Sequence, residues 1–377
     1  MKSLESIIKE PYRLFFPLGV LYLLMGALVW VPLIWNPGIY PILAHRFLML
    51  NGFVGSFVGG FLMTAVPKFS RTESAHSLEV SLYFAITLIG LIFAIYDHEF
   101  ATQIFSAMQA GTILSFLLRR IFKRQVNPPY SFVFIFVGLM LWIFSAIAGA
   151  FHDLEAFKNL HYEGASAAII LGVGSRLIPG ILGHVEIVSA QRERYEKPIS
   201  LLSTVPVPFF ILIASFVVSY FLGENAGNGL RLIVVGTVGL YFWKLYHFPK
   251  IRTSLTWSIW ISAWLIVLSF LLKATWAEGM IHVSHSFFIN GIVLLSLLIA
   301  TRVLQSHGPQ DNKLENLRLL YAVTGIIVLS AATRVSAFLM PETYLRHLSY
   351  ASILLCLAVC LWGFRYLRYA LVIPKQS

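Results

Sequence analysis

The residues best suited to chemistry in this sequence are its histidines. Eleven occur in a chain in which 58% of the residues are hydrophobic and only 12% are charged. Ionisable groups are costly inside a bilayer, so those that occur there usually face an interior site. A neutral imidazole can bind haem iron or copper, and a methionine sulfur can act as a further soft ligand. The histidines therefore predict a bound metal centre.

His45 is the first candidate ligand. It lies near the start of the segment AHRFLMLNGF, in which Met49 follows one helical turn later and Gly52 comes after it. Residues three or four apart share a helix face, so an imidazole, a thioether and a gap would lie on one surface, which fits the edge of a haem. His45 also fits an interfacial histidine bonded to a loop carbonyl, and this segment alone does not decide between the two.

A second pair of histidines supports the metal interpretation. His282 and His285 are three residues apart, and they would lie on one helix face at the start of a later apolar segment. At that depth they could meet His45, His161 or His347. A bis-histidine haem requires two such ligands from separate helices, although sequence alone does not show that these helices converge.

Some arginines also lie in apolar segments. Arg176 occurs in GVGSRLIPG, and Arg334 occurs in a later apolar block. A buried arginine needs a carboxylate, a carbonyl or a ligand anion such as a haem propionate. Arg302 and His307 occur together in RVLQSHGP, at the end of another segment, where a basic residue also fits ordinary anchoring at the membrane surface.

Several other chemistries are missing from the sequence. Cys356 and Cys360 are the only cysteines, which excludes a disulfide framework. They lie four residues apart in the last apolar block and fit either small packing residues or soft copper ligands. There is no Gly-rich phosphate loop, no C-x-x-C-H haem attachment motif and no H-E-x-x-H zinc motif. These absences argue against an ATPase and a c-type cytochrome.

The elements that must position the histidines are membrane-spanning helices. The mean hydropathy is +0.78, and apolar blocks of about 20 residues, the length that a span requires, recur along nearly the whole chain. We predict an all-α polytopic transmembrane bundle of about twelve spans, forming a single domain over residues 1–377. The predicted spans are residues 14–35, 43–67, 77–96, 100–122, 130–151, 161–182, 200–222, 228–246, 254–275, 280–305, 315–340 and 344–370.

The distribution of charge predicts how these spans are oriented. The net charge is +11, but the basic residues are dispersed over short joints instead of forming one stripe, which argues against nucleic-acid binding. With a cytoplasmic N-terminus, most of the 28 Lys and Arg residues fall in cytoplasmic joints, as the positive-inside rule requires. Both termini are therefore predicted to be cytoplasmic. The second and sixth spans are rich in glycine, which predicts that they are central, and no internal repeat is evident.

Four segments of the chain carry a resemblance to a known family. They are EPYRLFFPLG before the first span, HRFLMLNGFVGSFVGGFLMTAVPKF across the second, GSRLIPG in the sixth, and a weaker match from HVSHSFFING to ATRVLQSHG in the tenth. Together they resemble the NnrS proteins, which are polytopic bacterial membrane proteins. The resemblance implies an inner-membrane protein that binds haem and copper and takes part in the response to nitric oxide and nitrosative stress.

The family's motifs can be carried over residue by residue. They fall on His45, Arg176, Pro179, His285, Arg302 and His307. Two departures are present, because Arg46 stands where some members have glutamate, and LQSHGPQ lacks the final arginine of the family's usual L-G-H-T-G-R. These departures indicate a divergent branch with altered copper binding.

Residue chemistry and resemblance together give two sets of candidates. The predicted metal ligands are His45, Met49, His161, His282, His285, His307 and His347. The predicted cofactor-binding residues are Arg46, Arg176 and Arg302, of which Arg46 or Arg176 would balance propionates.

The leading hypothesis is a haem protein of the bacterial inner membrane, with copper as a second cofactor and His45 and His285 as the best candidates for metal ligation. Its partners would be the lipid bilayer and nitric oxide or a related small molecule. Two alternatives stay open, a secondary transporter or exporter without metal and a membrane assembly factor that handles metal. The sequence does not decide whether the protein is an enzyme.

Overall fold

The computed structural model describes residues 2–35, 40–152, 155–184, 186, 205–276, 279–307 and 316–371. Within these ranges every regular element is a helix, and no strand occurs. Ten of the described helices are long and apolar enough to cross a membrane. The prediction of a polytopic all-α membrane bundle is therefore confirmed.

The crossing helices are of two kinds. Seven are continuous: α2 (Tyr12–Leu28), α5 (Ser77–Ile95), α6 (Glu99–Phe122), α7 (Phe132–Phe151), α14 (Ser254–Thr275), α17 (Arg318–Ser336) and α18 (Tyr344–Tyr366). Three contain a π-helical segment: α3–η2–α4 (Ile42–Phe47, Leu48–Val54, Gly55–Ser70), α8–η3–α9 (Glu155–Asn159, Leu160–Gly164, Ala165–Ile181) and α15–η6–α16 (Met280–Ser286, Phe287–Val293, Leu294–His307). Short helices flank them: α1 (Lys2–Lys9), η1 (Val31–Ile34), η8 (Pro341–Thr343) and α19 (Arg368–Leu371).

Two of the twelve predicted spans, 200–222 and 228–246, are not among the ten. The first contains α12 (Val207–Val218), which has 12 residues, and its residues 200–204 lie outside the described residues. The second overlaps α13 (Glu224–Thr237) and η4 (Val238–Phe242). The helix α12 is shorter than the roughly 20 residues that a span needs, and α13 begins with the polar sequence ENAGNG. The described part of the chain thus has ten helices of crossing length.

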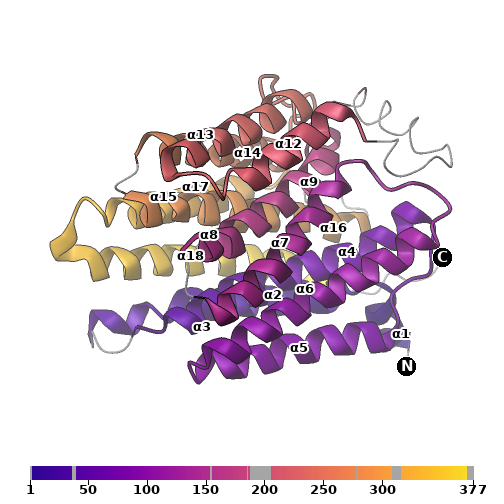
Figure 1. The fold of residues 1–377 in the computed structure, drawn as a ribbon, viewed down its shortest axis with the longest axis horizontal. Helices are drawn as coiled ribbons and strands as arrows, with labels where there is room; N and C mark the ends of the chain where they lie inside the picture. The colour runs from indigo at the N-terminus through magenta and orange to yellow at the C-terminus, as the bar shows by residue number, and fades with distance from the viewer. Residues whose placement is uncertain are drawn as a thin grey trace.

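The long helices run side by side along the longest axis of the molecule (Figure 1). The last long helix, α18, packs against the first, α2, and so joins the two halves of the chain. Near the start of α2, Nη1 of Arg13 donates to the carbonyl oxygen of Ala370 in α19 at 3.0 Å. The two ends of the described chain therefore lie at the same end of the bundle, as the prediction of two cytoplasmic termini requires. The cytoplasmic orientation itself stays a prediction.

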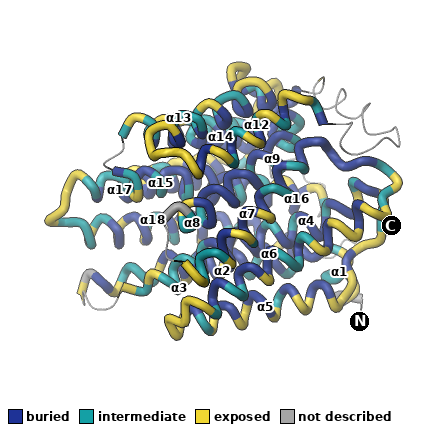
Figure 2. The backbone as a smooth tube through the Cα atoms, viewed as in Figure 1, coloured by how far each residue is buried: buried dark blue, intermediate teal, exposed yellow. Residues whose placement is uncertain are grey.

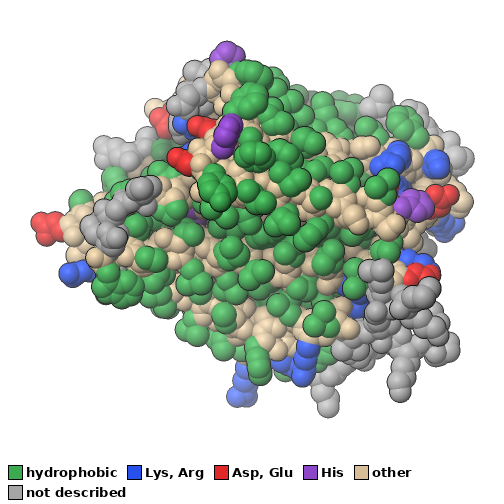
Figure 3. Space-filling model, turned by 90° about the horizontal axis from the view of Figure 1, so that it is seen from below, with side chains coloured by type: hydrophobic (Ala, Val, Ile, Leu, Met, Phe, Trp, Pro, Cys, Tyr) green, Lys and Arg blue, Asp and Glu red, His purple; other side chains and the backbone are tan. Residues whose placement is uncertain are grey.

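The outer surface of the bundle is apolar. Figure 3 shows one face covered largely by hydrophobic side chains, with the charged side chains placed around its periphery. Figure 2 shows buried residues along the interior helices, whereas α5 at the edge alternates between buried and exposed positions. An apolar belt with charged ends is what a bilayer requires of the protein that crosses it.

The three interrupted helices form the centre of the bundle. The most hydrophobic windows of these spans are 83%, 67% and 72% buried, whereas those of the other crossing helices are 39–56% buried. The glycines explain part of this burial, since a Cβ at Gly52 would lie 2.7 Å from the ring of Tyr22 and one at Gly172 would lie 2.7 Å from Ile135. The prediction that the second and sixth spans are central is confirmed, and the interrupted helix 280–307 joins them.

The π-helical segments are stabilised by side chains from neighbouring helices. A π-helix disturbs the regular backbone hydrogen bonding of an α-helix, so loosened carbonyls need other donors. The carbonyl oxygen of Asn51 in η2 accepts from Nε2 of Gln109 at 2.9 Å, and that of Asn290 in η6 accepts from Oγ of Ser262 at 2.7 Å. A side-chain donor from another helix thus bonds an asparagine carbonyl in two π-helical segments that are far apart in the chain, although no repeat is evident in the sequence.

Candidate cofactor site

A cavity of about 480 Å³ opens between the central helices. It lies at the end of the bundle away from α1 (Figure 1). Its walls include residues of all three interrupted helices, together with residues of α2, α17 and α18. Segments from the beginning, the middle and the end of the chain therefore converge on one space.

The cavity is amphipathic. Apolar side chains of η2, η6 and α18 line one wall of the cavity. They include Leu50, Phe53, Val54, Ile292 and Leu355. Charged side chains also line the cavity, namely Arg46, Lys158, Glu163, Glu224 and Arg334. A concave apolar space with a few polar groups at its mouth is the usual form of a cofactor or ligand site.

His45 of α3 lines this cavity, and one of its two ring nitrogens is hydrogen-bonded to a neighbouring helix. Its Nδ1 lies 2.7 Å from the carbonyl oxygen of Gly26 in α2. Because a carbonyl oxygen only accepts, this contact places the ring proton on Nδ1 and leaves the lone pair on Nε2. The indole Nε1 of Trp30 lies 2.9 Å from the same Nδ1. Because an indole N–H only donates, this contact taken alone favours the opposite tautomer. We assign the proton to Nδ1 because the carbonyl contact is the shorter of the two, and the indole of Trp30 then packs beside Nδ1 without a hydrogen bond to it.

His285 of α15 lines the same cavity and has the same tautomer. Its Nδ1 lies 2.6 Å from the carbonyl oxygen of Ile281, one turn earlier in its own helix. The ring proton is therefore on Nδ1 and the lone pair is on Nε2. Among the described residues, no hydrogen bond engages Nε2 of either His45 or His285. Two histidines from opposite halves of the chain, each assigned an unprotonated Nε2, thus line one cavity.

Met49 and two arginines complete the site around the histidines. Met49 lines the cavity, and its sulfur packs closely against Gly26, where a Cβ would lie 2.9 Å from it. The guanidinium of Arg46 lies 5.3 Å from the ring centroid of Tyr162. Arg334 is buried, and its Nη1 donates to Nδ1 of His282 at 2.8 Å. Neither arginine forms an ion pair within the described part of the chain.

One protein family matches nearly the whole chain. The family model of the NnrS protein matches residues 6–372. The chain belongs to the NnrS family. No protein with a curated description matches it. The NnrS match runs through every helix that lines the cavity, so the cavity is built entirely from the part of the chain that defines the family.

His161, in the sixth predicted span of this NnrS protein, lies outside the cavity. Its side chain is buried, with Nδ1 3.0 Å from Oγ of Ser145 and Nε2 3.3 Å from Oγ of Ser106. Oγ of Ser106 also accepts from Nε1 of Trp142 at 2.9 Å and from Nδ2 of Asn51 at 2.8 Å. Both imidazole nitrogens have protein partners, so His161 is placed as a member of a hydrogen-bond network between helices.

His282 and His347 lie near the cavity without lining it. Because a guanidinium only donates, the contact with Arg334 makes Nδ1 of His282 the acceptor and places the ring proton on Nε2. His347 of α18 is bonded within its own helix, with Nδ1 3.0 Å from the carbonyl oxygen of Thr343. Of the two histidines three apart, only His285 therefore presents a lone pair to the cavity.

The other predicted site residues lie elsewhere. His307 stacks near Tyr12, with a ring distance of 5.3 Å, and its Nε2 is 4.0 Å from Oε1 of Glu10, at the end of the bundle where the termini lie. Arg302 is exposed on α16. Arg176 of α9 lies against the ring of Phe69, and its Nε is buried without a hydrogen bond in the described structure. None of these three residues lines the cavity.

The structure also contains a buried charge that sequence reasoning missed. Glu163 in η3 lines the cavity and forms an ion pair with Lys273 of α14, and the two side chains are only 4% and 3% exposed. Its Oε1 accepts from the hydroxyl of Tyr220 at 3.1 Å and lies 3.8 Å from Nε of Arg231. The available signal was a carboxylate inside an apolar span, which is rare and costly.

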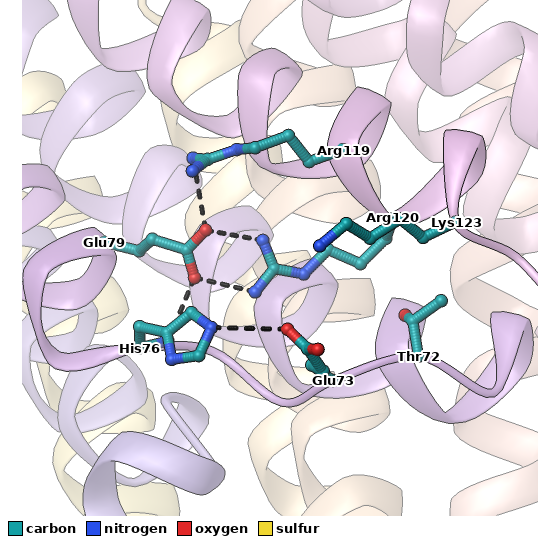
Figure 4. Close-up of a pocket in the computed structure, with 7 residues that line it drawn as sticks. All are labelled: Thr72, Glu73, His76, Glu79, Arg119, Arg120 and Lys123. Carbon is teal, nitrogen blue, oxygen red and sulfur yellow. Dashed lines mark hydrogen bonds and ion pairs between the residues drawn. The ribbon is translucent and has the colours of Figure 1, made fainter.

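A second, smaller cavity of about 80 Å³ lies at the opposite end (Figure 4). Its carboxylate, Glu79 at the start of α5, accepts two hydrogen bonds from Arg120 at 2.5 and 2.7 Å and lies 3.1 Å from Arg119. His76 lies 3.6 Å from Glu73 at its edge. Since the carboxylate is fully engaged by α6, we interpret this cluster as an anchor between α5 and α6.

Proposed function

We propose that this protein is a haem protein of the bacterial inner membrane that acts in the response to nitric oxide, and that His45 and His285 are the residues that would hold the haem iron. The observation that carries the proposal is the pair of Nε2 lone pairs at one cavity, each with Nδ1–H directed to a backbone carbonyl. Histidines that bind metals usually donate their other nitrogen in this way, which fixes the tautomer and the ring plane.

The remaining walls fit the other parts of a haem. The apolar residues of η2, η6 and α18 would contact the macrocycle, and the cations that line the cavity would neutralise its two carboxylates. Arg46 and Arg334 support this role because neither has a carboxylate partner among the described residues. Arg176 and Arg302 do not line the cavity, so we propose Arg334 in their place beside Arg46. When bound, haem iron supplies a centre at which nitric oxide can bind.

Copper is the second cofactor that the family implies. Met49 lies one turn from His45, and both line the cavity. No group of three or more His, Cys, Asp or Glu side chains that could hold a metal ion occurs in the part of the chain that the structure describes. We therefore assign His45 and His285 to the haem iron and assign no residues to copper.

The test is a visible spectrum of the detergent-purified protein, oxidised and reduced, with iron and copper quantified on the same sample. We expect one Soret band per chain that shifts on treatment with nitric oxide. His45→Ala and His285→Ala should each change the spectrum, whereas His347→Ala, a histidine near the cavity that does not line it, should leave it unchanged. A protein without a Soret band after expression with adequate haem would favour a transporter that uses the cavity as a substrate path.

A further inference from the structure

The two candidate ligands are held in different ways. The hydrogen bond of His45 crosses from α3 to α2, where its acceptor is Gly26. Trp30, between the end of α2 and the start of η1, packs edge-on against the same ring with centroids 5.0 Å apart. Within the described residues, His285 has no comparable contact with another helix, because its acceptor, Ile281, belongs to α15 itself. Its described ring contact is with Phe288, in the same interrupted helix, at 5.9 Å.

This difference determines which hydrogen bond and ring contact are lost when either imidazole moves away from the cavity. A shift of α15 carries His285 and its acceptor together, so the hydrogen bond survives. A movement of His45 separates it from Gly26 and Trp30, which stay with α2. The loss of one net hydrogen bond corresponds to a preference of roughly five-fold for moving His285.

The first turns of the two interrupted helices are otherwise alike. Each consists of a short α-helix, α3 or α15, followed directly by a π-helical segment. Local helix geometry therefore does not distinguish the two histidines. The difference lies in the cross-helix contacts of His45.

We infer that His45 is the permanent axial ligand and that His285 is the exchangeable one, which leaves when a small neutral molecule such as nitric oxide or carbon monoxide binds. This inference rests on the proposed function. In the exchange the bond from iron to Nε2 of His285 breaks and a bond to the incoming molecule forms. One neutral donor replaces another, so the exchange itself requires no electron and no proton.

The experiment uses the full-length, reduced protein in detergent, with carbon monoxide as the probe and stopped-flow absorbance as the readout. In the unmodified protein the binding rate should level off at high carbon monoxide, because His285 must leave first. His285→Ala should keep its haem, and its binding rate should rise linearly with carbon monoxide and exceed the plateau at least tenfold. His45→Ala should lose most of its haem or keep the plateau.

A further variant covers the case in which either alanine variant fails to fold. Trp30→Leu removes the aromatic ring that packs edge-on against His45, and so weakens the support of His45 while leaving His285 untouched. If His285 is the exchangeable ligand, this variant should leave the plateau rate unchanged; a plateau raised severalfold would show that His45 leaves, and would overturn the inference.

The failures of the two proposals are distinguishable. If His45→Ala keeps haem and binds carbon monoxide without a plateau while His285→Ala does not, the assignment of the two ligands is wrong and the haem proposal stands. If the unmodified protein has no Soret band, the haem proposal itself fails.

Discussion

Neutralising Glu163 should destabilise this protein more than any change of an exposed charge. In Glu163→Gln the ammonium of Lys273 stays buried, 3% exposed, and loses its carboxylate partner. Removing one partner of a buried ion pair costs about 3–5 kcal/mol, because the other charge is left uncompensated. Arg231 lies 3.8 Å from the same carboxylate and adds a second cation to the site. The glutamine oxygen can still accept from Tyr220, so we expect about 3 kcal/mol.

The same reasoning predicts that a second substitution rescues the first. In Glu163→Gln/Lys273→Met the buried ammonium is removed and the methionine fills a similar volume with apolar atoms, so that of Lys273 and Arg231 only Arg231 is left without the carboxylate. Replacing a buried ion pair by apolar groups is often neutral or stabilising. The double variant should therefore be more stable than Glu163→Gln alone, which is the opposite of two additive losses.

The assay is unfolding of the detergent-purified variants in mixed micelles with rising denaturing detergent, followed by tryptophan fluorescence. The matched control is Glu5→Gln, which breaks the exposed pair between Glu5 and Lys9 in α1. Exposed pairs of this kind contribute little, so this variant should unfold like the unmodified protein. The reasoning is refuted if Glu163→Gln unfolds like Glu5→Gln, or if the double variant is less stable than the single one.

Three further predictions follow from the packing of the bundle and its charge pattern. His161→Ala should unfold more easily, because it removes the buried imidazole that links Ser106 to Ser145, but should keep its Soret absorbance per chain; loss of the band to the extent seen in His45→Ala would show that His161 binds the cofactor. Gly59→Val should lower the thermal midpoint by several degrees, since a Cβ there would lie 2.5 Å from the ring of Tyr83, whereas Gly111→Ala, with no atom within 4 Å, should not. A green fluorescent protein fused to the C-terminus should fluoresce in bacterial cells, and a dark fusion at normal expression would contradict the cytoplasmic orientation.

The sequence predicts the bundle well because the bilayer imposes a simple rule of length and polarity. Each apolar block of sufficient length became a crossing helix, and the two exceptions, 200–222 and 228–246, contain a short helix and a polar helix start. The glycines of the second and sixth spans correctly marked central helices, since at positions such as Gly52 a side chain would collide with a neighbouring helix. These are properties of one segment at a time, which a single sequence contains in full.

The site was only partly predictable, because spacing determines the face of one helix and not the helix that it meets. His45, Arg46, Met49 and His285 all line the cavity, as a shared outer position suggested. His161 has the same depth and residue type, but its helix turns it toward Ser106 and Ser145. Arg334 was visible as an arginine within an apolar block, yet its bond to His282, which distinguishes that histidine from His285, depends on the packing of α15 against α17.

The two ligand-bearing helices share a feature that a histidine count does not capture. An Asn-Gly pair follows His45 after five intervening residues, at Asn51, and follows His285 after four, at Asn290. Both pairs lie within π-helical segments, where the asparagine carbonyl accepts from a side chain of another helix. The glycine of each pair allows close packing, against Tyr22 for Gly52 and against Ile266 for Gly291.

This shared feature separates the two cavity histidines from His161. In the third interrupted helix the π-helical segment contains Glu163 and Gly164, so a carboxylate takes the place of the amide. Glu163 turns to Lys273 and lines the cavity itself, while His161 turns to the serines. In this chain, an Asn-Gly pair that follows a histidine after four or five intervening residues therefore distinguishes the two proposed ligands better than depth alone, because the pair also marks a packed π-helical segment next to the imidazole.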